Sequence, residues 1–419
     1  MNPENRSAGL ESYLAVGGYE AARRAATSLD PREIADLVLA SGLRDRLDPA
    51  EPCGSRWARI REAAGAGAEA RLAACAAVRD PGCTLDRSIL ERRPHRVVEG
   101  AIIAARAIGA SSAVVYVRRE LAAAARALER AIDEARALGF LGPRAFGSPS
   151  RIEIEVWRGP ALPPRRDASA FLAAIEGARW GPAPPGRGGE PVPRISGAPV
   201  ALHGLEALAA LPGILAGGRA ATGPAPAGGS AASVAVSASG HVERPGLYEV
   251  SPGTPLRDVI DGPAGGVWRR RALKAAFPRG LSGPILSARD LEVSAAAHWS
   301  VARDRSRSCA LIVLDETTDA RALLFWLARS YELASREHCG PCREASAWIL
   351  RIAERLRSGA GRPGDAGRIA AICRALGESR LCAEAPAASS PIESLIEKFG
   401  AEIERGASKT PPGDAAPHG

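Results

Sequence analysis

The sequence has 419 residues, enough for two or three domains, and 46% of them are hydrophobic, which is ordinary for a globular protein. The formal net charge is +8, but the arginines that supply it alternate with acidic residues along the expected helices. This pattern is typical of solvated helix faces and argues against a nucleic-acid surface. The sequence opens without an export signal, and Glu99 and Arg106 interrupt its most apolar stretch, so we expect no membrane insertion.

The first half of the chain predicts an α/β domain, because helical and strand patterns alternate along it. Apolar residues at a 3.6-residue period predict helices over 11–29, 31–41, 96–110 and 120–140. Stretches rich in β-branched residues predict strands over 112–119 and 150–159. Residues 43–90 are loop-rich and hard to assign.

The second half begins after a stretch rich in Gly, Ala and Pro over 216–233, which predicts a linker. Two strands around a turn at 244–246 and a short helix then predict a small α+β module over 234–305. Four stretches with helical periodicity follow and predict a helical bundle within 306–405. The tail over 406–419 is expected to be disordered.

Three of the eight cysteines form a pattern that bears on chemistry. Cys339 and Cys342 make a C-x-x-C pair beside an expected helix, and Cys382 follows forty residues later. Two thiolates so placed can bind one metal ion or cluster. The same spacing also fits a redox dithiol, although the helical setting lacks the usual βαβ pattern, or unligated cysteines.

The segment 331–344, YELASREHCGPCRE, resembles the motif Y-x-x-E-S-C-G-x-C-x-P-C-R-E of one subunit of NADH:quinone oxidoreductase, the flavoprotein that binds NADH, FMN and an iron–sulfur cluster. Related hydrogenases and formate dehydrogenases share this motif. The resemblance implies an iron–sulfur cluster on Cys339, Cys342 and Cys382. Arg336 stands at the first ligand position, with His338 as a weak substitute, so a [3Fe–4S] or a labile [4Fe–4S] cluster is expected.

The resemblance extends over nearly the whole chain, through ILERRPHRVVEGAIIAARAIGASSAVVYVR at 89–118 and SGHVERPGLYEVSPGTPLRDVID at 239–261. It implies an α/β flavin/nucleotide-type domain over 1–215, which binds FMN and NADH in the family. A β-grasp (ubiquitin-like) module over 234–305 and a four-helix iron–sulfur bundle over 306–405 are expected to follow.

The flavin-binding loop of the family, S-G-L-R-G-R-G-G-A-G-F-P-T-G-x-K-W, reads SGLRDRLDPAEPCGSRW at 41–57. Glycines let backbone N–H groups approach a flavin closely, and most of them are replaced here. Residual flavin-loop positions are Arg46, Gly54 and Arg56, the last in place of a lysine. Four glycines become Asp45, Leu47, Asp48 and Ala50.

Two further cofactor motifs of the family are also altered. The motif C-N-A-D-E-G-E-P-G-T-F-K-D-R reads CAAVRDPGCTLDR at 75–87, and G-A-G-A-Y-I-C-G-E-E-T-A-L reads GPALPPRRDASAF at 159–171. An Asn-Asn pair near the end of the domain is His203-Gly204. FMN and NAD are therefore implied by the family, while the residues that would bind them are largely absent from the sequence.

These observations predict a divergent paralogue that retains the fold and acts as a non-catalytic structural or interaction protein in a redox complex. The alternatives are an iron–sulfur electron-transfer subunit, or an active subunit that passes electrons from NADH through FMN to a [4Fe–4S] cluster. The expected partners are other subunits of an NADH dehydrogenase or hydrogenase-type complex. The expected location is cytoplasmic, peripheral to the inner membrane through such a complex.

Overall fold

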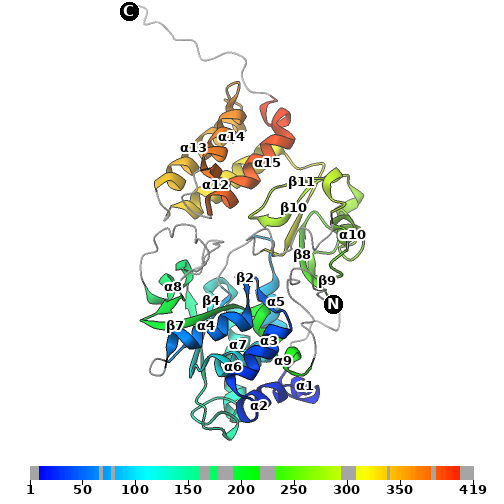
Figure 1. Cartoon of the computed structure of the whole chain (residues 1–419). Helices are drawn as coiled ribbons and strands as arrows, with labels where there is room; N and C mark the ends of the chain where they lie inside the picture. The colour runs from blue at the N-terminus through cyan, green and yellow to red at the C-terminus, as the bar shows by residue number, and fades with distance from the viewer. Residues whose placement is uncertain are drawn as a thin grey trace, which may run out of the picture.

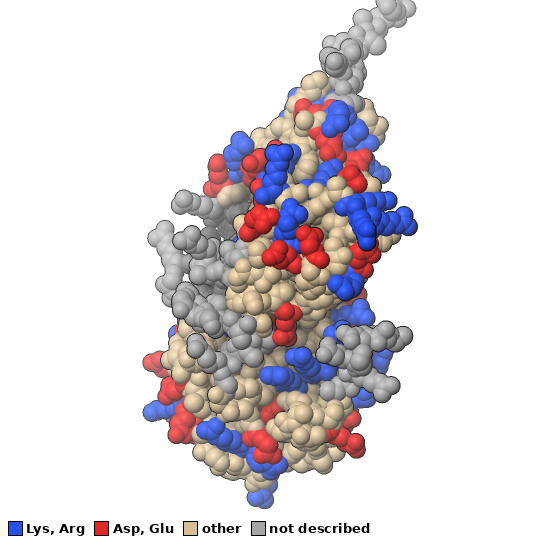
Figure 2. Space-filling view, turned by 90° about the vertical axis from the view of Figure 1, so that its right-hand side faces the viewer, with Lys and Arg blue, Asp and Glu red and all other residues tan. Residues whose placement is uncertain are grey.

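The computed structural model describes residues 9–65, 69–76, 81–159, 169–177, 192–217, 233–293, 308–336, 340–378 and 384–405. The described elements form an N-terminal α/β domain, a mixed sheet and a group of C-terminal helices, which follow one another along the molecule (Figure 1). Basic and acidic side chains are intermixed over the face drawn in Figure 2. No described helix is both long and apolar enough to cross a bilayer.

The N-terminal domain is built on a sheet with the strand order β5-β4-β3-β7-β6, in which only β6 runs antiparallel to its neighbour. These strands are β3 (Arg71–Ala76), β4 (Ser112–Arg118), β5 (Glu153–Gly159), β6 (Arg194–Ile195) and β7 (Ala198–Gly204). The helices of the domain are α1 (Leu10–Ala15), α2 (Glu20–Thr27), α3 (Pro31–Ala40), α4 (Cys53–Ala64), α5 (Leu85–Arg92), α6 (Pro94–Ile108), α7 (Ala122–Ala137), α8 (Ser169–Glu176) and α9 (Leu205–Leu215).

Helix α6 lies at the centre of this domain and is buried along most of its length. Its Glu99 carboxylate accepts hydrogen bonds from the Tyr13 hydroxyl and, at 3.1 Å, from the backbone N–H of Ala22. At the next position of α6, a Cβ on Gly100 would lie 1.9 Å from the carbonyl oxygen of Leu208 in α9. Thus Glu99 anchors the N-terminal helices, and Gly100 lets α6 and α9 touch through their backbones.

Two expectations for this domain need correction. The single helix expected over 11–29 is divided into α1 and α2, because Gly17 and Tyr19 adopt positive φ angles of 82° and 66°. Residues 43–90 are not mainly loop: they contain the hairpin of β1 (Arg44–Asp45) and β2 (Asp48–Pro52), then α4, β3 and α5. The alanine-rich strand β3 lacks the β-branched residues that would have identified it in the sequence.

The second sheet has the strand order β11-β10-β12-β8-β9 among the described residues. Its elements are β8 (Val234–Gly240), β9 (Gly246–Val250), α10 (Leu256–Asp261), β10 (Leu273–Leu281), β11 (Leu286–Ser287) and β12 (Ala310–Asp315). Strand β12 pairs in parallel with β8 and antiparallel with β10. The sheet therefore continues past the expected module boundary at 305, because a strand distant in sequence completes its centre.

The C-terminal helices are α12 (Ala320–Ser335), α13 (Gly340–Arg357), α14 (Asp365–Glu378) and α15 (Glu384–Glu404). They confirm the helical stretches expected within 306–405. Their buried side chains share one core with Ala275 and Phe277 of β10 and with Ile285. Lys274 Nζ also donates to Glu402 Oε1 at 2.8 Å. The sheet and the helices are therefore packed together through a shared core.

Candidate functional site

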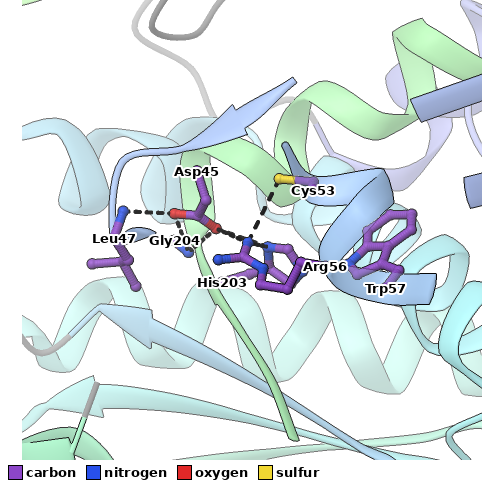
Figure 3. A network of polar contacts seen from close by, with 7 residues as sticks. All are labelled: Asp45, Leu47, Cys53, Arg56, Trp57, His203 and Gly204. Atoms are coloured by element: carbon purple, nitrogen blue, oxygen red, sulfur yellow. Dashed lines mark hydrogen bonds and ion pairs between the residues drawn. The ribbon is translucent and has the colours of Figure 1, made fainter. Parts of the chain in front are cut away.

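The segment that resembles a flavin loop forms the β1–β2 hairpin and the first turns of α4, next to the end of β7 (Figure 3). Asp45 lies in this hairpin and is completely buried. Its Oδ1 accepts the backbone N–H of Leu47 at 2.7 Å, and its Oδ2 accepts that of Gly204 at 3.0 Å. The Asp45 carboxylate thus occupies backbone N–H groups from both the loop and the end of β7.

His203 is the side-chain partner of Asp45, with 2.7 Å between His203 Nδ1 and Asp45 Oδ2. The indole of Trp57, which can only donate, gives its Nε1–H to His203 Nε2 at 2.8 Å. His203 therefore carries its proton on Nδ1 and donates it to Asp45. Burial alone would raise the pKa of Asp45, but the hydrogen bond from His203 and the charge of Arg56 hold that pKa below its usual value.

Arg56 supplies the positive charge of this network and is itself buried. Its Nη2 lies 3.6 Å from Asp45 Oδ2, 3.3 Å from His203 Nδ1 and 3.6 Å from Cys53 Sγ. The ligand atoms of Asp45, Cys53 and His203 all lie within 4.8 Å of one another, a spacing that suits a metal ion. Here the guanidinium of Arg56 contacts all three groups and stands where a cation would stand.

Arg46, the second basic residue of the loop, binds Glu206 at the start of α9. The two side chains form a bidentate ion pair with distances of 2.8 and 3.1 Å, and both are mostly buried. Burial by itself would lower the pKa of Arg46, but the carboxylate of Glu206 outweighs this effect and raises the pKa above its ordinary value. The guanidinium therefore stays charged. The Glu206 carboxylate therefore neutralises the charge of Arg46 within the protein.

Asp86 is a retained position of the second cofactor motif and lies near the same charges. Burial raises the pKa of its carboxyl group to about 7, against the opposing charge of Arg118. The charges of Glu206 and Arg46 act on it with opposite signs. Asp86 is therefore a carboxyl group that changes its charge near neutral pH.

The three residual flavin-loop positions all have partners within the fold. Arg46 pairs with Glu206, and Arg56 is held beside Asp45. A Cβ on Gly54 would lie 2.4 Å from the carbonyl oxygen of Ala35, so this glycine is needed for α3 and α4 to pack. The sequence motif identified these positions, but their contacts in the structure are with the protein itself.

The proposed cluster region is described only in part, since Cys339, His338 and Cys382 lie outside the described residues. Cys342 is buried in the first turn of α13. The side chain of Arg336 is 63% exposed and makes a bidentate ion pair with Glu332, with distances of 2.9 and 3.1 Å. In the described part of this region, the Arg336 side chain is thus exposed to solvent and paired with Glu332 of α12.

Sequence reasoning missed the pairing of Asp45 with His203. In the sequence each residue is a departure from the family motif, Asp45 in place of a glycine and His203 in place of an asparagine. The signal was their chemical complementarity, since a buried carboxylate and an imidazole can satisfy each other. In the third motif, Arg165, Arg166 and Asp167 lie outside the described residues.

Comparisons with known proteins agree with this arrangement of domains. Residues 38–209 match the Nuo51 FMN-binding domain, and residues 236–277 match the SLBB domain. Residues 323–406 match the NADH-ubiquinone oxidoreductase-F iron-sulfur binding region. A crystal structure of an NAD+-reducing [NiFe]-hydrogenase in the H2-reduced state superposes with a TM-score of 0.79 at 27% identity. The match covers 98% of this chain and 68% of that one.

Similar sequences come from several bacteria. An NADH-quinone oxidoreductase subunit of Rhizobium meliloti is 33% identical over 94% of this chain and 93% of its own length. The corresponding subunit of the Escherichia coli enzyme is 32% identical over 95% of this chain and 89% of its own length. NADP-reducing hydrogenase subunit HndC of Solidesulfovibrio fructosivorans is 31% identical over 96% of this chain and 81% of its own length. The chain therefore belongs to the family of flavoprotein subunits of NADH-quinone oxidoreductase.

Proposed function

We propose that this chain is a non-catalytic structural or interaction subunit of an NADH dehydrogenase- or hydrogenase-type redox complex. Its FMN and NADH sites are lost and its fold is retained. The observation that carries this proposal is the buried network of Asp45, His203 and Arg56 in the loop that resembles the flavin loop. In this loop the charged side chains are paired with one another. A flavin-binding protein needs such groups to face its cofactor.

Electrostatics support this proposal. The Asp45 carboxylate is ionised and buried, and like charges repel strongly where water is excluded. In the family, glycine N–H groups of this loop are available to a phosphate. Here the negatively charged flavin phosphate would instead be repelled by the Asp45 carboxylate. The positive charge of Arg56 is already shared with Asp45, and that of Arg46 with Glu206.

Backbone geometry supports the same conclusion. The N–H groups of Leu47 and Gly204 donate to Asp45 at 2.7 and 3.0 Å. A buried N–H that is already hydrogen-bonded gains little by exchanging its partner. The residues present in the loop therefore do not fit a tightly bound FMN, and we assign no hydride-transfer step to this chain.

The test is purification without added flavin, followed by a visible absorption spectrum and a fluorescence titration with FMN. We expect no flavin absorption in the purified protein, no saturable FMN binding and NADH:ferricyanide activity at background. Glu51→Gln is a matched variant, because it removes an acid from the same loop that pairs with Arg59 near the surface. It should change none of these results. Stoichiometric flavin, or NADH oxidation above background, would establish the active-subunit alternative instead.

A second candidate function is an iron–sulfur electron relay, favoured by the match of residues 323–406 to an iron–sulfur binding region. Cys342 is buried, and a 2.5 Å hydrogen bond between Ser335 and Ser346 joins α12 to α13 beside it. Cys339, Cys342 and Cys382 would hold a cluster, which would accept and release one electron at a time.

Anaerobic reconstitution, iron counting and EPR test this second function. We expect a [3Fe–4S] or a labile [4Fe–4S] signal if three thiolates suffice. Arg336→Cys should then give a stable four-iron cluster, because it restores the fourth thiolate. If neither protein takes up iron, the relay is excluded and the structural role stands alone.

We also propose that β8 to β12 with α10 form a β-grasp module and that α12 to α15 form a four-helix bundle.

A further inference from the structure

Two cysteines outside the iron–sulfur motif meet at the junction between the N-terminal domain and the second sheet. Cys83 lies in the loop before α5, and Cys309 directly precedes β12. Their Sγ atoms are 3.5 Å apart, although 226 residues separate them in the sequence. Both are free thiols in this structure.

Several contacts hold the Cys83 loop on the sheet. The Ser237 hydroxyl donates to the Gly82 carbonyl at 2.7 Å and accepts the backbone N–H of Thr84 at 3.1 Å. Gly82 has a φ of +83°, and a Cβ there would lie 2.8 Å from the Ile312 side chain in β12. The positions on both sides of Cys83 are therefore fixed against β8 and β12.

The two thiols differ in their access to solvent. Cys83 is partly exposed, whereas the other cysteines in the described part of the chain are buried. Cys309 is fully buried. Its hydrogen bond with Cys83 and its burial raise the pKa of the Cys309 thiol, although the charge of Arg46 acts in the other direction. Cys83 is thus the sulfur that a solution reagent meets first, with a protonated thiol beside it.

We propose that Cys83 and Cys309 are a redox dithiol that reacts with small disulfides of the glutathione class and closes a reversible disulfide between the two domains. The Cys83 thiolate attacks one sulfur of the disulfide, whose S–S bond breaks, and one thiol leaves. Cys309 then attacks Cys83 Sγ, and the second thiolate leaves and takes up the proton that Cys309 gives up. Two protein thiols are oxidised by two electrons, and one disulfide is reduced to two thiols.

This reaction needs little movement, because the sulfurs must approach from 3.5 Å to a bond length of about 2.05 Å. The reduced pair already lies in contact in the folded chain, which raises its effective concentration. The bond would tie a loop of the N-terminal domain to the residue that directly precedes β12. Oxidation would therefore add a covalent link at the junction between the domains, and reduction would leave the junction to its non-covalent contacts.

The test is incubation of the reduced full-length protein with oxidised glutathione, followed by alkylation and peptide mapping without reduction. We expect one peptide pair linked through Cys83 and Cys309, faster migration on a non-reducing gel and a rise of several degrees in Tm. Mapping separates this bond from oxidation at the C-x-x-C cysteines. Added reduced glutathione should reverse both the link and the Tm shift.

Three variants assign the roles of the two sulfurs. Cys309→Ser should accumulate glutathione on Cys83, whereas Cys83→Ser should leave Cys309 unmodified because it is buried. Cys373→Ser, a buried cysteine in α14, is the control and should form the link like the wild type. Circular dichroism checks that each variant is folded. The proposal is overturned if the wild type forms no Cys83–Cys309 link, or if it stops at glutathione on Cys83.

Discussion

At the scale of single residues, two departures from the family motifs bind each other. Asp45 and His203 lie 158 positions apart and meet at 2.7 Å in a buried site. The family motifs have a glycine and an asparagine at these positions. Either residue without the other would be a buried polar group that lacks its main partner. The effect of each residue on the free energy of unfolding therefore depends on the presence of the other.

Asp45→Asn tests this coupling. The change leaves the Arg56 charge buried without a carboxylate and should lower the free energy of unfolding by about 3–5 kcal/mol at neutral pH. Urea unfolding measures it. Glu51→Gln, in the same loop, removes only a more exposed ion pair with Arg59 and should cost about 1 kcal/mol or less. Equal effects of the two variants would contradict the role of the network.

The stability difference between wild type and Asp45→Asn should depend on pH, in the direction set by the lowered pKa of Asp45. The pKa of Asp45 in the folded protein lies below the ordinary value of 3.8. Its contribution to stability is therefore complete above pH 3.8 and is lost as the pH falls through the folded pKa. We expect the gap between wild type and Asp45→Asn to narrow when unfolding is measured under increasingly acidic conditions. A constant gap would show that Asp45 is not ionised.

Asp86→Asn should show the opposite trend. Burial raises the pKa of Asp86 from 3.8 to about 7, so its contribution to stability is present in acid and is lost as the pH rises through about 7. Since Asn mimics the neutral carboxyl group, the variant should gain stability relative to wild type as the pH rises from 3.8 to about 7, by at most about 4 kcal/mol. Denaturant unfolding at the two pH values measures this gain, and a gain in acid instead would refute the raised pKa.

At the scale of elements, hydrophobic periodicity located α6, α7 and the C-terminal helices, because a buried helix face repeats in the sequence itself. It did not reveal β3, whose alanines fit a helix as well as a strand. It also joined α1 to α2, since the positive φ of Tyr19 leaves no trace in the pattern of apolar residues. Nor does the pattern of apolar residues show which elements pack closely against each other, because it reports only on residues that are near in the sequence.

Gly100→Ala tests the contact between α6 and α9. A Cβ at this position would lie 1.9 Å from the Leu208 carbonyl oxygen, so the helices must move apart, at a cost of about 1–3 kcal/mol or more. Thermal unfolding measures the effect. Gly367→Ala in α14 is the control: beyond its chain neighbours and the nearby backbone of its own helix, no atom lies within 4 Å of its Cβ, so the substitution should stabilise by up to about 1 kcal/mol. Stabilisation by both variants would contradict the close approach.

At the scale of the whole molecule, the second sheet and the C-terminal helices share a core, although the sequence suggested separate units. Phe277 of β10 is buried against the same cluster as Leu324 of α12 and Ile403 of α15. A shared core makes two regions unfold together, because neither buries its apolar face alone.

Phe277→Ala should therefore weaken both regions. Loss of a buried phenylalanine costs about 3–5 kcal/mol, and amide hydrogen exchange should rise in α12 and α15 as well as in β10. Phe171→Ala, in a separate core of the N-terminal domain, should leave exchange in α12 unchanged. Faster exchange confined to β10 would mean that the two regions are independent after all.

The sequence by itself determined the family, the order of the domains and most of the long helices. Motif spacing and periodicity are properties of neighbouring residues, so they can be read without coordinates. Only the tertiary structure decided which side chains meet: Asp45 with His203, Arg46 with Glu206, and Cys83 with Cys309. These pairs join residues more than 150 positions apart, and a local pattern can show that a residue needs a partner but not which residue the fold will bring to it.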